Sequence, residues 1–309
     1  LALEAQRIAA EAGPSIWGTS WPRELVLAFA LELPDGERSS FFDTLNSSAQ
    51  LKLDVAEALD AIADPRRGLE RLCKRTDELY VLWIAKHALA ALCRTEASLA
   101  FDALASLDFN SYQEQSLLQI IAENWPLDSW RAGIADALAW ALPARHDKTF
   151  RIVDFLERLL ARTGAIEPAA ALDALDRTIA ALKPGTLYRS LVQKAIISAA
   201  AEADPIPTQH WPLLVARSVA IEDSGPRSYA LDSLLAALPR LPPQDRTRCT
   251  VLTLAAFGQG PAKPVLQGAE AMVYAALAAE PALKGQGETL AARLEALLAE
   301  LQASVLTVA

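Results

Sequence analysis

The stretch LYRSLVQKAIISAAAE, residues 187–202, shows the pattern that decides the fold. Its apolar side chains recur every three or four residues. The residues that share one predicted face are Leu187, Leu191, Val192, Ala195, Ile196 and Ala199. Because this spacing matches the turn of an α-helix and not the alternation of a β-strand, the stretch predicts an amphipathic helix. Such a helix needs a neighbour to cover its apolar face.

The same pattern recurs along the chain, and helix-start signals divide it into segments. Residues 287–302 place leucines on one face, at Leu290, Leu294, Leu297, Leu298 and Leu301. Proline follows Asp64, Trp125 and Trp211 at points where the first turn of a helix tolerates it. Together these signals predict helices over residues 2–12, 22–33, 38–63 with a break near Asn46, 65–75, 77–93, 95–106, 111–124, 128–142, 147–162, 168–182, 187–202, 208–222, 226–238, 244–257, 264–279 and 287–302.

The composition also predicts an all-α fold. Of the 309 residues, 52% are hydrophobic but only 6% are aromatic, so alanine and leucine supply most of the apolar surface. Both are strong helix formers, whereas the β-branched and aromatic residues that favour strands are scarce. We therefore expect no sheet of appreciable size.

The predicted helices follow one another at a regular spacing. They begin about 15 to 22 residues apart, so a helix pair repeats every 35 to 40 residues or so. A shift of 38 residues aligns Leu69, Leu79, Leu82 and Trp83 with Leu107, Leu117, Ile120 and Ile121, and a further 114 residues align these with Ile221, Leu231, Leu234 and Leu235. This period predicts antiparallel helix pairs stacked side by side, an α-solenoid, with a compact irregular helical domain as the alternative.

Two segments carry a resemblance to known repeat families. They are ALASLDFNSYQEQSLLQIIA, residues 103–122, and VAIEDSGPRSYALDSLLA, residues 219–236. In both, a helix ends in an aliphatic residue and an acid, and a short polar turn opens the next helix. The segments resemble degenerate helix-turn-helix repeats of the tetratricopeptide or HEAT type, although none carries the tryptophan, glycine, tyrosine and proline of the tetratricopeptide signature. The resemblance implies a protein-binding scaffold with no active site.

The chain as a whole is expected to be one helical repeat domain over residues 1–309, with an irregular part over residues 1–63. Because it begins at Leu1 within a helical pattern, we expect a fragment of a longer polypeptide. Cys73, Cys93 and Cys249 lie in apolar stretches, which is typical of free thiols in a reducing compartment such as the cytoplasm. The longest apolar run, residues 79–93, is shorter than a membrane span, which needs about 20 residues.

Residues that could carry chemistry are scattered. The histidines His87, His146 and His210 have no histidine or cysteine three or four residues away, so no zinc site is predicted. No phosphate-binding loop or nucleophile motif occurs. Two acid pairs have the three-residue spacing with which helical enzymes hold metal ions. They are Asp54 with Glu57, and Asp173 with Asp176. Acids at this density are more typical of a solvated face, so we predict no catalytic residue, metal or cofactor.

The most marked charge pattern lies in residues 65–75, where Arg67, Arg71 and Arg75 align at four-residue spacing beside Arg66 and Lys74. Arginine forks suit carboxylates and phosphates of a partner. Alternatively, acids such as Glu70, Asp77 and Glu78, or those of a neighbouring helix, neutralise the stripe. The candidate partner-binding residues are Arg67, Arg71, Lys74 and Arg75.

Tryptophans form a second cluster, at Trp125, Trp130 and Trp140. Aromatic residues on an open face would be natural anchors for a partner. A tryptophan at a helix start also packs back onto the first turn as a hydrophobic staple, and this structural role is the one we expect.

These observations favour a non-enzymatic scaffold or regulatory module that binds a protein or peptide. One alternative is an all-helical enzyme, such as a toroidal transferase or lyase, with dispersed carboxylates in a cavity. Another is a HEAT-like nucleic-acid binder, which the net charge of −9 opposes because most of the surface would repel phosphates.

Overall fold

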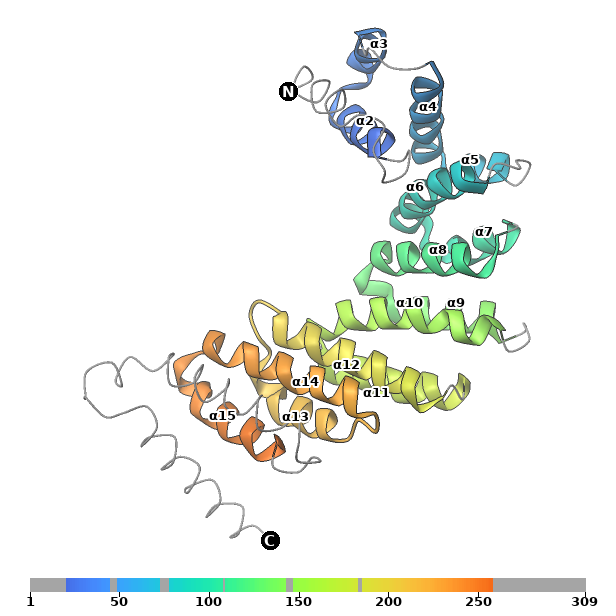
Figure 1. Cartoon of the computed structure of the whole chain (residues 1–309). Coiled ribbons are helices and arrows are strands. Elements are labelled where there is room, and N and C mark those ends of the chain that lie inside the picture. Colours follow the sequence, from blue (N-terminus) through green and yellow to red (C-terminus); the bar gives the residue numbers. More distant parts are fainter. Residues whose placement is uncertain are drawn as a thin grey trace. The chain divides into compact units, whose positions relative to one another are not determined.

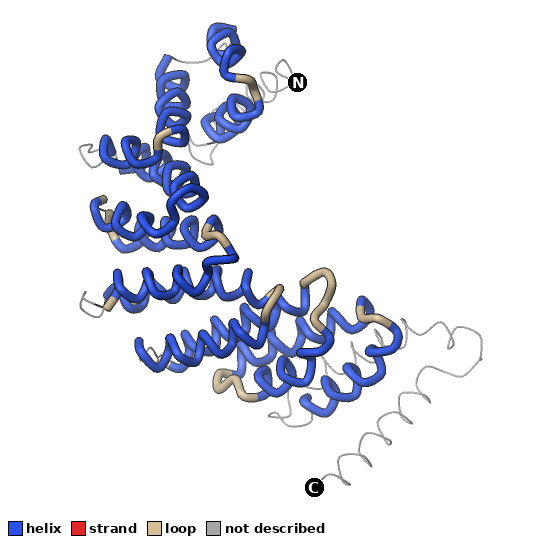
Figure 2. The backbone as a smooth tube through the Cα atoms, turned by 180° about the vertical axis from the view of Figure 1, so that it is seen from behind, coloured by secondary structure: helices blue, strands red, loops and turns tan. Residues whose placement is uncertain are grey.

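The computed structural model describes residues 21–44, 49–72, 78–107, 109–142, 147–182 and 185–257. Throughout these ranges the regular elements are helices, and none is a strand (Figure 2). The all-α prediction is therefore confirmed for this part of the chain. None of its helices is both long enough and apolar enough to cross a membrane. The chain divides into two compact units, Leu1–Pro126 and Leu127–Ala309.

The first unit contains α2 (Trp21–Glu32), α3 (Asp35–Thr44), α4 (Ala49–Ala63), α5 (Pro65–Leu72), α6 (Glu78–Glu96), the 3-10 turn η1 (Ala97–Leu99), α7 (Ala100–Ser106) and α8 (Ser111–Asn124). Helix α6 is central, because it packs on α4, α5, α7 and α8. Its side chains Ile84 and Leu89 are fully buried, as are Leu117 and Ile121 of α8.

The second unit contains η2 (Leu127–Ser129), α9 (Trp130–Ala141), α10 (Asp147–Gly164), α11 (Pro168–Leu182), α12 (Thr186–Glu202), η3 (Thr208–His210), α13 (Trp211–Val219), α14 (Ser224–Ala237), η4 (Leu238–Arg240) and α15 (Pro243–Phe257). Helices α10, α12 and α14 lie side by side, from green to orange in Figure 1. Helix α11 packs on α10 and α12, and α13 packs on α12, α14 and α15. The Trp211 indole is buried and donates a 3.0 Å hydrogen bond to Thr253, which links α13 to α15.

Contacts follow the order of the sequence in both units. With the exception of α3, each described helix packs mainly on the next helix along the chain or on the next but one. No principal contact joins helices that are far apart in sequence within a described unit. Most of the described helices thus cover their apolar side with near neighbours.

Helix α12 shows where the predicted face was incomplete. Leu187, which the pattern places on the buried face, is 51% exposed, whereas Gln193 and Ile197, which the pattern leaves out, are buried. The reason is that α12 packs on α10, α11, α13 and α14, so it is covered on more than one side. A single stripe describes a helix with one neighbour and underestimates the burial of a helix with four.

In the described residues the helix boundaries agree closely with the sequence prediction at most ends, with three main local differences. The predicted helix over residues 95–106 is interrupted, because α6 runs on to Glu96 and η1 precedes α7. The predicted helix over residues 128–142 begins with η2 before α9. The predicted helix over residues 208–222 begins with η3, and α13 ends at Val219. The predicted helices over residues 2–12, 264–279 and 287–302 lie outside the described residues. The predictions of one domain over residues 1–309 and of an irregular part over residues 1–63 stay predictions.

Candidate functional site

The predicted arginine stripe lies on the short helix α5. Gly68, Leu69 and Leu72 are buried against the neighbouring helices, and the opposite side presents an arginine surface made of Arg66, Arg67 and Arg71, all exposed. The Asp64 carboxylate accepts a 3.2 Å hydrogen bond from the Arg67 backbone N–H, which caps the start of the helix. Lys74 and Arg75 lie outside the described residues.

Acids of neighbouring helices lie beside two of these three arginines. Arg66 pairs with Glu96 at the end of α6, and the Arg71 Nη1 atom is 3.9 Å from the Asp60 carboxylate of α4. Both pairs are exposed, so each contributes little to stability. A guanidinium has five N–H donors, and most of those in the arginine surface remain available to a partner.

The acid pair of α4 is part of the packing. Asp54 is 1% exposed, and its carboxylate is 2.6 Å from the Arg23 guanidinium of α2. Glu57 accepts a 2.6 Å hydrogen bond from the Tyr80 hydroxyl of α6. The Arg23 guanidinium also lies over the Tyr80 ring, 5.7 Å from its centroid. These four side chains connect α2, α4 and α6.

The acid pair of α11 is likewise engaged with arginines. Asp173 is 2.7 Å from Arg177 on the same helix. Asp176 lies 3.0 Å from Arg189 of α12 and 2.7 Å from Arg217 of α13. Among the described residues, no group of three or more His, Cys, Asp or Glu side chains is arranged to hold a metal ion. Asp54, Glu57 and Asp176 therefore link neighbouring helices, whereas Asp173 pairs within α11.

His87 belongs to a polar contact between α2 and α6. Its Nε2 atom is 3.2 Å from the Glu24 carboxylate, which also accepts a 2.7 Å hydrogen bond from the Trp83 indole. The imidazole stands edge-on to the Trp83 ring. Burial lowers the pKa of His87, and the nearby Glu24 carboxylate partly opposes this effect. His210 lies in η3, and His146 falls outside the described residues.

The two described cysteines are buried and free. Burial raises the pKa of the Cys93 thiol to about 12 and that of the Cys249 thiol to about 11. A thiol is nucleophilic only when it is deprotonated, so neither side chain is suited to catalysis at neutral pH. Cys73 lies outside the described residues.

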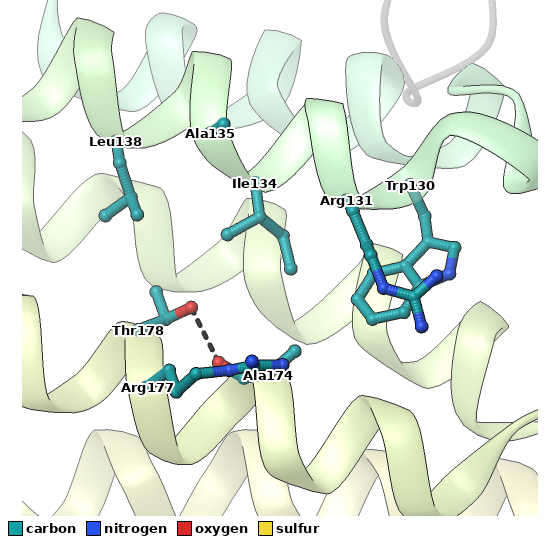
Figure 3. Close-up of a pocket in the computed structure, with 8 residues that line it drawn as sticks. All are labelled: Trp130, Arg131, Ile134, Ala135, Leu138, Ala174, Arg177 and Thr178. Carbon is teal, nitrogen blue, oxygen red and sulfur yellow. Dashed lines mark hydrogen bonds between the residues drawn. The ribbon is translucent and has the colours of Figure 1, made fainter.

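A hollow of about 300 Å³ lies between α9 and α11 in the second unit, and we call it the α9–α11 groove (Figure 3). Its lining residues come from these two helices: Trp130, Arg131, Ile134, Ala135, Leu138, Ala174, Arg177 and Thr178. Trp130, Ile134 and Ala174 are buried and form an apolar floor. Arg131 and Arg177 are exposed and stand at its rim.

The polar groups of the groove are the guanidinium groups at the rim and the Thr178 hydroxyl, which is bonded within its own helix. The Arg131 guanidinium lies over the Trp130 ring, 4.4 Å from its centroid, and 3.9 Å from the Glu167 carboxylate. The Thr178 hydroxyl donates a 2.7 Å hydrogen bond to the Ala174 carbonyl of its own helix, as the dashed line in Figure 3 shows. The floor therefore offers hydrophobic contact, and the rim offers guanidinium groups.

Sequence reasoning identified only part of this groove. The tryptophan cluster pointed to Trp130, whereas nothing in the local pattern connected Trp130 with Ala174 and Arg177, which come from another helix. Trp125, from the same cluster, is fully buried and packs on Phe101 of α7 with the ring centroids 5.9 Å apart.

Comparison with known proteins gives no identification. The chain matches no family model, no curated protein and no solved structure. The resemblance to tetratricopeptide and HEAT repeats stays a prediction from the residues quoted above.

Proposed function

We propose that this chain is a non-enzymatic scaffold that binds a protein or peptide partner, and that its helices stack in antiparallel pairs as an α-solenoid. The observation that carries the proposal is the order of the contacts, since each described helix except α3 packs mainly on the next one or two along the chain. Repeat proteins are built in this way, because each repeat contacts only its neighbours. A globule with one common centre would also bring distant helices together.

Burial at the aligned positions supports the proposed repeat. Leu69, Leu107 and Ile221, which the 38-residue register superposes, are 2%, 5% and 1% exposed. Trp83, Ile121 and Leu235, which form a second aligned set, are 6%, 0% and 7% exposed. These two sets are buried at every position, as stacked repeats require, whereas in a third set Leu82 and Ile120 are half-buried and Leu234 is buried.

The partner site that we propose is the arginine surface of α5, extended by Lys74 and Arg75. Its guanidinium groups are exposed, and their pairs with Asp60 and Glu96 are surface pairs that a partner's carboxylates can replace at low cost. The partner would accordingly present an acidic surface. The buried free cysteines Cys93 and Cys249 suit a reducing compartment, and we propose a cytoplasmic location.

The experiment is affinity capture with the full chain, followed by quantitative mass spectrometry. We expect the double variant Arg67→Glu/Arg71→Glu to lose most of at least one partner that the unchanged chain retains. The matched control is Arg94→Glu/Arg248→Glu, which reverses two other exposed arginines. If both double variants retain all partners equally, the arginine surface is not the site. Circular dichroism of each variant verifies that it is folded.

A further inference from the structure

The α9–α11 groove combines an apolar floor with two cationic side chains at its rim. We propose that it is a second binding site, and that its occupant is an acidic amphipathic helix of a partner protein. This inference rests on the proposed scaffold function and adds the chemistry of one partner. The groove lies in the second unit and shares no residue with the arginine surface of α5.

The size of the groove limits what can enter. Its volume of about 300 Å³ is at the lower end of the range for ligand sites, which is roughly 300 to 1,000 Å³. Small side chains open the space, because Ala135 of α9 and Ala174 of α11 line it. A groove of this size suits one or two large aliphatic or aromatic side chains.

The hydrogen-bonding capacity of the floor argues for a helix. The floor residues Trp130, Ile134 and Ala174 are buried, and the Thr178 hydroxyl already donates to the Ala174 carbonyl. An extended peptide pressed into this floor would leave its backbone N–H and C=O groups without partners, which costs free energy. A helix satisfies those groups internally and presents only side chains, as in other complexes in which a helix lies in a groove.

The rim explains why the helix would be acidic. The side chains of Arg131 and Arg177 are 67% and 70% exposed. Stacking on Trp130 orients the Arg131 guanidinium, so part of the entropy of fixing it is already lost before binding. Each arginine has one acid nearby, Glu167 at 3.9 Å and Asp173 at 2.7 Å, and both pairs are exposed. Such pairs are weak, so carboxylates of the partner can join or replace them.

The test selects binders for the full chain from a phage-displayed library of random peptides. We expect the enriched peptides to carry apolar residues at helical spacing flanked by Asp or Glu. Synthetic copies are then measured by fluorescence anisotropy against defined variants. Arg131→Glu/Arg177→Glu should weaken binding at least tenfold, and Arg131→Lys/Arg177→Lys should weaken it less.

A steric variant tests the groove independently of charge. Ala135 is exposed and lines the groove, so Ala135→Trp should block it and abolish binding without disturbing the core. Ala132, on the same helix, is also exposed but lies outside the lining, and Ala132→Trp should leave the affinity unchanged. Equal affinity of both tryptophan variants would overturn the proposal, as would enrichment of peptides without carboxylates.

The failure of this inference differs from the failure of the scaffold function. Peptides that lose affinity in Arg67→Glu/Arg71→Glu but tolerate Ala135→Trp would place binding at the arginine surface and overturn only the second site. A library without any enriched binder would overturn the second site, whereas the scaffold function is decided by the affinity capture.

Discussion

Two glycines let neighbouring helices approach at distances that a side chain would block. A Cβ atom on Gly68 of α5 would lie 2.6 Å from the Ala61 Cβ and 2.7 Å from the Ala61 Cα of α4. A Cβ atom on Gly164 of α10 would lie 2.7 Å from the Ile196 Cγ2 of α12. Because the first obstruction includes backbone, it cannot be relieved by moving a side chain.

We predict that Gly68→Ala destabilises the protein by about 1 to 3 kcal/mol, the usual cost of overpacking a core. The sign of this change in unfolding free energy is informative. Alanine is a better helix former than glycine by about 1 kcal/mol, so helix propensity alone would stabilise the protein. Denaturant-induced unfolding measures the difference. The control is Gly36→Ala in α3, where nothing lies within 4 Å of the added Cβ, so stability should stay equal or rise. Equal effects of the two changes would show that the α4–α5 approach is not tight.

His87 predicts how stability depends on pH. Burial holds the pKa of His87 below its ordinary value, so the unfolded chain binds a proton more readily than the folded chain. The free energy of unfolding should therefore fall as pH decreases from about 6.5 toward the lowered pKa of the folded state. We expect His87→Gln to flatten the profile in this window, as measured by denaturation across pH. Above about pH 7.5 the two profiles should run parallel, and a parallel course throughout would contradict the prediction.

At the scale of the element, the ends of two helices are capped by arginines of other elements, whose side chains donate hydrogen bonds to the last carbonyls. Arg240, in η4, donates hydrogen bonds to the carbonyls of Ala201, Glu202 and Ala203 at the end of α12, at 3.3, 3.1 and 2.9 Å. Arg38 of α3 donates to the Ala30 carbonyl in the last turn of α2 at 2.8 Å. The last carbonyls of a helix have no partner within it, so these arginines supply donors that the helix lacks.

We expect Arg240→Ala to destabilise the protein by about 1 kcal/mol, because three carbonyl contacts at the end of α12 are lost together. Thermal and denaturant unfolding give the value. Arg248→Ala, at an exposed position of α15, is the matched control and should change stability by less than about 0.5 kcal/mol. If the two substitutions are equivalent, the Arg240 contacts contribute nothing in solution.

At the scale of the whole molecule, the two units each have a hydrophobic core of their own. Leu89 of α6 and Ile197 of α12 are both 0% exposed, one in each unit. Where contacts are mainly between near neighbours, the loss of packing in one region is felt mostly there.

We predict that Leu89→Ala, at a cost of about 2 to 5 kcal/mol, accelerates amide hydrogen exchange in α4 to α8 and leaves α10 to α14 protected. Ile197→Ala should give the reverse pattern. Mass spectrometry of peptides from the exchanged chain measures the exchange rates of both units in one experiment. Uniform acceleration in both units after either substitution would mean that they unfold as one cooperative body.

For the described residues, the sequence alone determined the all-α fold class and most of the helix boundaries, because both follow from local spacing and local start signals. The bounds predicted for α8 and α11 agree with the structure at both ends. Helical periodicity and proline placement are properties of a few consecutive residues, so no distant contact is needed to recognise them.

Only the tertiary structure decided which side chains meet. The acids beside Arg66 and Arg71 come from α6 and α4, and the groove joins Trp130 of α9 to Ala174 of α11. The burial of Gln193 and Ile197 likewise depends on the four helices around α12. Periodicity tells which residues share a face, but the distance and rotation between two helices depend on side-chain packing along their whole contact, which local spacing does not encode.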